Sequence, residues 1–141
     1  MTRKASAVWR GGLKDGKGTI SSESGVLKDT QYSFSTRFEN GIGTNPEELV
    51  AAAHAGCFSM AFSAELGKAG ITPESIRTTA TITLDKTDAG WTITESHLDV
   101  AARIPGVDVA KFTAAANAAK AGCPISRLLK ATVTMNAKLE S

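Results

Sequence analysis

Residues 49–62 read Leu-Val-Ala-Ala-Ala-His-Ala-Gly-Cys-Phe-Ser-Met-Ala-Phe, and this stretch decides the fold. A surface helix has one apolar stripe, but here only His54 and Ser59 interrupt apolar residues around the whole helix axis. Such a helix has to be buried on every side. One sheet of about six strands and an alanine-rich second helix would cover only part of it. We therefore expect a second copy of the chain to cover the rest, in a symmetric homodimer.

Clear start and stop signals flank this stretch. Thr44 or Asn45 can cap the helix, and Pro46 suits its first turn. Two glutamates follow, where the positive end of the helix dipole favours negative charge. The pattern stops at Gly70. The sequence therefore predicts a central helix from about Pro46 to Lys68.

The other elements follow from alternating residues and from turn residues. Strands are expected over residues 4–10, 16–20, 31–38, 79–84, 91–102 and 132–139, and helices over residues 108–120 and 124–129. In the third strand Tyr32, Phe34 and Phe38 would share one face, and Arg37 would lie on the other. The alternation changes phase near His97, which predicts a bulge there.

The order of these elements predicts the fold class. Strands come in blocks, so the pattern is typical of an α+β fold with a mainly antiparallel sheet around the central helix. The chain has 141 residues, which fits a single domain over residues 1–141.

Composition excludes several classes of protein. Sixteen basic and fourteen acidic residues leave a net charge of +2, too even for a nucleic-acid-binding protein. Neither a secretory signal nor a run of eighteen apolar residues is present. We therefore expect a cytoplasmic protein that binds neither nucleic acid nor membranes.

The two cysteines, Cys57 and Cys123, lie 66 residues apart, in neither a Cys-x-x-Cys nor a zinc-ribbon spacing. In a reducing cytosol they would stay thiols, and they could simply be small buried side chains. Cys57 lies about 15 Å from the start of its helix, so the helix dipole does not activate it. Burial raises the pKa of a thiol, so a reactive Cys57 needs a cation from elsewhere in the protein.

Two histidines add further candidates. His54, three residues before Cys57, is either a packed, hydrogen-bonded core residue or a partner for that thiol. A zinc site built from His54, His97 and the two cysteines lacks the usual ligand spacing. We expect neither a metal nor a cofactor.

Several segments are familiar in combination. The runs Gly43-Thr44-Asn45-Pro46-Glu47-Glu48-Leu49 and Ala53-His54-Ala55-Gly56-Cys57-Phe58-Ser59-Met60 closely resemble the OsmC branch of the OsmC/Ohr hydroperoxide reductases. Further matches to this family lie in residues 24–27, 36–39, 84–86, 88–90 and 120–124, in family order along nearly the whole chain.

This resemblance implies an OsmC-like fold, an intertwined homodimer with two interface sites, and a role in oxidative and osmotic stress. It implies a thiol peroxidase that reduces organic hydroperoxides, and hydrogen peroxide to some extent, with a dithiol reductant of lipoyl type. Carried over to this sequence, Cys57 matches the peroxidatic cysteine and Cys123 the resolving cysteine that forms a disulfide with it. Arg37 matches the arginine that holds the thiolate, and Glu47 its carboxylate partner.

Two rivals stay open for these roles. Glu48 could replace Glu47, and Arg10, before a Gly-Gly turn, could replace Arg37. Glu47 and Cys57 are ten residues apart on one helix, or about 15 Å along its axis. We therefore expect the glutamate that serves each Cys57 to come from the partner chain.

The sequence is also compatible with other functions and with other roles for these residues. The same cysteine pair could make a non-enzymatic redox sensor or a stress-protective binding protein, and His54 could form a Cys–His hydrolase dyad. Phe58, Met60 and Phe62 could line a pocket for alkyl groups or could be core alone. Gly56 could admit a close backbone contact beside Cys57.

Overall fold

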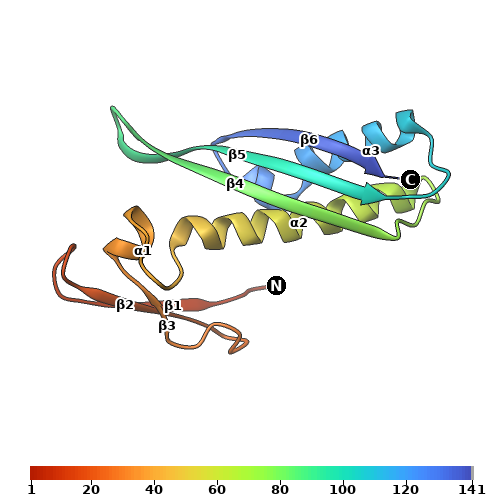
Figure 1. The fold of residues 1–141 in the computed structure, drawn as a ribbon. Coiled ribbons are helices and arrows are strands. Elements are labelled where there is room, and N and C mark those ends of the chain that lie inside the picture. Colours follow the sequence, from red (N-terminus) through yellow and green to blue (C-terminus); the bar gives the residue numbers. More distant parts are fainter. Residues whose placement is uncertain (141) are drawn as a thin grey trace. The chain divides into compact units, whose positions relative to one another are not determined.

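A computed structural model describes residues 1–140, which form two compact units, residues 1–49 and residues 50–140. The elements (Figure 1) are β1 Ala5–Arg10, β2 Lys17–Ser22, β3 Thr30–Tyr32, α1 Phe34–Phe38, α2 Pro46–Lys68, β4 Ser75–Thr87, β5 Gly90–Arg103, α3 Val109–Gly122, α4 Pro124–Leu128 and β6 Thr132–Glu140. The predicted α+β class is confirmed.

The first unit contains a three-stranded antiparallel sheet in the order β1-β2-β3. Gly18 on β2 pairs with Trp9 on one side and with Tyr32 on the other. The two aromatic rings lie 5.5 Å apart, and a Cβ atom at Gly18 would collide with both. Glycine is therefore required here because the neighbouring aromatic side chains cover its backbone.

The predicted strand over residues 31–38 is wrong beyond Tyr32. Ser33 caps the short helix α1: its hydroxyl accepts from the Thr36 N–H, and the Thr36 hydroxyl accepts from the Ser33 N–H. This reciprocal capping turns the chain into a helix. Phe34 and Phe38 then meet four residues apart, with ring centroids 4.9 Å apart. In the sequence, a spacing of four residues fits one face of a strand as well as one face of a helix.

The second unit is built on the sheet β4-β5-β6, in which β5 is the central strand (Figure 1). β4 and β5 pair antiparallel, but β5 and β6 pair parallel because the chain returns through α3 and α4. The single sheet of about six strands expected from the sequence is thus two sheets of three. The predicted bulge is displaced: the register shifts between Thr83 and Leu84, opposite Thr94, three residues before His97.

One face of this sheet carries the core. Along β5 every second side chain from Ser96 to Ala102 is buried. The core cluster joins residues of β5 to residues of α2 and α3, among them Phe58, Phe62, Leu66, Leu98, Phe112 and Ala116. The second unit therefore holds the middle and end of α2 against a sheet and a second helix.

The predicted bounds of α2 are confirmed. Asn45 caps the helix: its side-chain oxygen accepts from the Glu48 N–H at 2.7 Å. The buried side chains occur every fourth residue, at His54, Phe58, Phe62 and Leu66. This stripe is the only buried part of α2 in the described chain, so the single chain leaves much of the apolar helix open.

α2 is also long and apolar enough to cross a membrane, by length and composition alone. A core helix passes the same test, and the buried stripe of α2 packs within the hydrophobic cluster of the second unit. The absence of a membrane role stays a prediction from the sequence.

Candidate active site

The two cysteines meet in the second unit. Cys57 lies in the middle of α2, and Cys123 lies at the junction of α3 and α4. Their sulfur atoms are 2.7 Å apart, and both are free thiols. Cys123 is fully buried, while Cys57 is partly exposed. The pair is therefore placed for disulfide chemistry, with one sulfur open to a substrate.

The surroundings of Cys57 disfavour its ionisation. Burial raises the pKa of the Cys57 thiol, and the hydrogen bond and charge interaction with Cys123 act in the same direction. A hydrogen bond from the backbone N–H of Ile125 lowers the pKa, but by less than burial raises it. Within residues 50–140 no cation contributes to these shifts. A thiolate at this position therefore needs a positive charge that the second unit does not provide.

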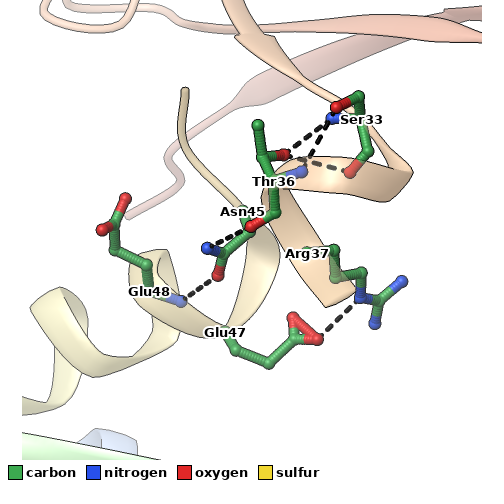
Figure 2. Close-up of polar contacts among 6 residues, drawn as sticks. All are labelled: Ser33, Thr36, Arg37, Asn45, Glu47 and Glu48. Atoms are coloured by element: carbon green, nitrogen blue, oxygen red, sulfur yellow. Dashed lines mark hydrogen bonds and ion pairs between the residues drawn. The ribbon is translucent and has the colours of Figure 1, made fainter. Parts of the chain in front are cut away.

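An ion pair in the first unit brings Arg37 and Glu47 together (Figure 2). The Arg37 Nε donates to the Glu47 Oε1 at 2.6 Å, and the guanidinium carbon lies 5.4 Å from the centre of the Phe38 ring. Figure 2 shows the two terminal guanidinium nitrogens pointing away from Glu47. Glu47 thus binds the Nε edge of the planar Arg37 guanidinium, and the edge with the two terminal nitrogens points away from Glu47.

Only one of the two carboxylate oxygens of Glu47 takes part in this ion pair. Its side chain is 12% exposed, against 39% for Arg37. Its second oxygen, Oε2, is buried and accepts no hydrogen bond from residues 1–140. A buried carboxylate oxygen normally has a partner, so the described chain leaves this group incomplete.

The two rival residues have other positions. The Glu48 Oε2 accepts a hydrogen bond from the Thr44 hydroxyl at 2.8 Å, so Glu48 stabilises the N-terminal end of α2. Arg10 ends β1 and is exposed. Of the two glutamates, Glu47 is the one that contacts Arg37.

A cavity of about 270 Å³ adjoins Arg37 in the first unit. Its lining is mostly apolar and aromatic: Trp9, Leu13, Tyr32, Ser33, Phe34, Arg37 and Phe38. This cavity is not predicted from the sequence, because the expected strand puts Phe34 and Phe38 on the face opposite Arg37. The capping pair at the start of α1 was the available signal.

The aromatic residues near Cys57 have a structural role instead. Phe58 and Phe62 are fully buried and pack with each other, and Phe62 packs on Phe112 at 5.5 Å. They belong to the hydrophobic core of the second unit. Met60 is 77% exposed.

His54 is a buried, hydrogen-bonded core residue, one of the two interpretations that the sequence allows. Its Nδ1 lies 2.6 Å from the hydroxyl of Ser96 on β5, and its Nε2 lies 2.7 Å from the hydroxyl of Ser126 on α4. Burial lowers the pKa of the imidazole, which favours the neutral ring. The described residues contain no cluster of His, Cys, Asp and Glu suited to a metal ion.

The buried His54 predicts a loss of stability in mild acid. The pKa of His54 is lower in the folded chain than in the unfolded chain, so the unfolded chain takes up the proton first as the pH falls. Stability is therefore full above about pH 6.5 and decreases below it. Urea unfolding at pH 7.5 and at pH 5.5 measures this decrease. We expect it to be smaller in His54→Gln, and His97→Gln is the matched control. An equal decrease in wild type and His54→Gln would contradict this role.

Comparison with known proteins identifies the family of this chain. The family model for OsmC-like proteins matches residues 39–138. Peroxiredoxin OsmC of Escherichia coli is 54% identical over 139 residues, which cover 99% of this chain and 97% of that protein. The organic hydroperoxide resistance protein OhrB of Bacillus subtilis is 30% identical over 124 residues, covering 87% of this chain and 89% of that protein.

Solved structures share the fold. The crystal structure of Bacillus subtilis OhrB matches with a TM-score of 0.68 and 26% identity, covering 97% of this chain and 98% of that one. An OsmC-like protein from Vibrio cholerae matches with a TM-score of 0.78 and 17% identity, covering 97% of this chain and 99% of that one. With a family model over residues 39–138 and a full-length relative above half identity, the chain belongs to the OsmC family.

Proposed function

We propose that this chain is a peroxidase that reduces organic hydroperoxides, and hydrogen peroxide less efficiently, with electrons from a dithiol. The observation that carries the proposal is the 2.7 Å separation of the Cys57 and Cys123 sulfur atoms. Relatives named as a peroxiredoxin and as an organic hydroperoxide resistance protein support the same activity. In this role the protein would protect a cell against oxidative and osmotic stress.

The reaction needs two sulfur atoms in sequence. The Cys57 thiolate attacks the distal peroxide oxygen; the O–O bond breaks, the alkoxide leaves and is protonated to an alcohol, and Cys57 becomes a sulfenic acid. The Cys123 sulfur then attacks the Cys57 sulfur, and the S–O bond breaks. The leaving hydroxide takes the thiol proton and forms water. An external dithiol opens the resulting disulfide by exchange and is itself oxidised.

Arg37 would supply the cation that Cys57 lacks in its own unit. Its free guanidinium edge can contact a sulfur while Glu47 holds the other edge. Because α2 is continuous from Pro46 to Lys68, Glu47 and Cys57 of one chain are about 15 Å apart along its axis. We therefore propose that the Arg37–Glu47 pair of one protomer serves Cys57 of its partner.

A homodimer is supported by the open face of α2. Ala53, Gly56, Met60, Ser63 and Gly67 are all exposed and follow steps of three and four residues, the spacing of a helix-packing seam. Glycine inside a helix costs about 1 kcal/mol relative to alanine. A Cβ atom at Gly56 would meet no side chain or other element of residues 1–140 within 4 Å. A partner helix that approaches closely would account for the small residues on this face, which are all of the set except Met60.

The full-length match to solved structures supports the proposal that both units belong to one domain. Relatives from bacteria are compatible with the cytoplasmic location proposed for this chain.

Repeated turnover tests the activity. We expect the reduced protein to consume many equivalents of cumene hydroperoxide while dithiothreitol is present, and hydrogen peroxide more slowly. A redox sensor would instead consume about one equivalent per Cys57 and then stop. Peroxide consumption, followed by a ferrous–xylenol orange assay, separates these outcomes.

Mixing two inactive variants tests the shared site. We expect Cys57→Ser and Arg37→Gln homodimers to be nearly inactive separately. After subunit exchange, mixed dimers hold one site with both an intact Cys57 and an intact Arg37, so about a quarter of the wild-type rate returns. If the two residues served the same chain, exchange would restore nothing.

A further inference from the structure

α2 and α4 face each other through two matched pairs of side chains. His54 and Cys57 are three residues apart on α2, and Cys123 and Ser126 are three residues apart at the start of α4. The His54 Nε2 is hydrogen-bonded to the Ser126 hydroxyl at 2.7 Å, and the Cys57 sulfur lies 2.7 Å from the Cys123 sulfur. α2 and α4 are thus joined by two adjacent contacts, the His54–Ser126 hydrogen bond and the Cys57–Cys123 thiol pair, and the two elements run in opposite directions.

Besides its contacts with α3, α4 shows few features that would hold it in place. It is five residues long, it has no buried side chain, and its N-cap, Cys123, makes no side-chain capping hydrogen bond. A helix this short is not stable by itself, so its position depends on contacts with other elements.

His54 is well suited to fix that position. The ring is fully buried, and its other nitrogen is held by Ser96 on β5 at 2.6 Å. A neutral imidazole donates from one nitrogen and accepts at the other, so both serine hydroxyls can be satisfied at once. Packing already holds the buried ring, and of its two hydrogen bonds only the one to Ser126 links it to α4.

We propose that His54 and Ser126 are positioning residues for the resolving step: their hydrogen bond holds α4 so that Cys123 stays in contact with Cys57. The inference rests on the peroxidase function proposed above. The step they serve comes after the attack of Cys57 on the hydroperoxide, when Cys123 condenses with the sulfenic acid. Two reactions compete for the Cys57 sulfenic acid. Condensation with the Cys123 thiol gives the disulfide and releases water, whereas a second hydroperoxide oxidises Cys57 to a sulfinic acid and releases an alcohol. Fast condensation therefore shortens the lifetime of the sulfenic acid and protects Cys57 from over-oxidation.

The matched variants are Ser126→Ala and Ser96→Ala, because each removes one partner of the same imidazole. After one equivalent of cumene hydroperoxide, dimedone captures Cys57 that is still a sulfenic acid, and mass spectrometry measures the captured fraction. A lost hydrogen bond predicts about fivefold slower disulfide formation in Ser126→Ala, with more capture and more sulfinic acid. Ser96→Ala should stay within about twofold of wild type.

A general structural role predicts the opposite order. Ser96 is fully buried, so Ser96→Ala would then disturb disulfide formation at least as much as Ser126→Ala. Equal effects of the two variants, or an unchanged Ser126→Ala, would overturn the inference. His54→Gln and His54→Asn give a second comparison, since the Gln amide reaches the Nε2 position and the Asn amide the Nδ1 position. Only His54→Gln should keep fast disulfide formation.

A peroxide-free measurement separates this inference from the function on which it rests. The equilibrium between the Cys57–Cys123 disulfide and dithiothreitol gives the effective concentration of one thiol at the other. We expect it to fall about fivefold in Ser126→Ala and to stay near wild type in Ser96→Ala. If wild type consumed no hydroperoxide but this difference held, the peroxidase proposal would fail and the positioning role would stand.

Discussion

We expect the Cys57→Ser variant to lose hydroperoxide consumption almost entirely, a fall of at least about a thousandfold. A serine hydroxyl is not ionised at neutral pH and cannot form the sulfenic acid on which the reaction depends. The substitution is small, and Cys57 is only partly buried, so the fold should be retained. The steady-state rate with cumene hydroperoxide and dithiothreitol measures the loss.

Cys123→Ser is the matched control for that experiment. It removes the other member of the 2.7 Å pair but leaves the attacking sulfur in place. We expect the first oxidation of Cys57 at close to the wild-type rate and steady-state turnover lower by about tenfold, because the sulfenic acid must wait for external reductant. If Cys123→Ser stopped the first oxidation and Cys57→Ser did not, the two roles would be reversed.

The second large effect is expected at Arg37. Arg37→Gln should lower the hydroperoxide rate by about a hundredfold at neutral pH, because a nearby guanidinium shifts a thiol pKa by one to three units. Raising the pH should recover part of the rate, since the thiolate then forms without the cation. The rate constant for Cys57 oxidation, followed from pH 6 to pH 10, measures both effects.

Arg10→Gln is the control for Arg37→Gln, since it removes an exposed arginine from the same unit. It should leave the rate within about twofold of wild type. Glu47→Gln should have an intermediate effect, because it keeps the cation but loses the ion pair that orients it. A large loss in Arg10→Gln with none in Arg37→Gln would assign the cation to the other arginine.

The sequence predicts best the elements whose ends carry their own signals. α2 begins and ends where Asn45, Pro46 and Gly70 predict, because capping and helix breaking depend on nearby residues. The short helix α1 was mistaken for a strand, because alternation of Phe34 and Phe38 fits both periods. Only the Ser33–Thr36 capping pair distinguishes them.

Contacts between distant segments could not be predicted from local pattern. The parallel pairing of β5 with β6 depends on how α3 and α4 return the chain. His54 reaches Ser96 and Ser126, 42 and 72 residues away, and nothing in their spacing signals this bond. The family resemblance suggested that Cys57 and Cys123 would react together, and the fold places their sulfur atoms in contact.

Titration of Cys57 in the assembled protein tests the central claim most directly. In the chain described here burial raises the pKa of this thiol, so only an added cation can make it a ready nucleophile. Thiolate absorbance at 240 nm in the Cys123→Ser background isolates the one sulfur. We predict a midpoint well below the usual thiol value of about 8.5, and a rise above it when Arg37→Gln is added. A midpoint at or above that value in the presence of Arg37, unchanged by Arg37→Gln, would contradict the account.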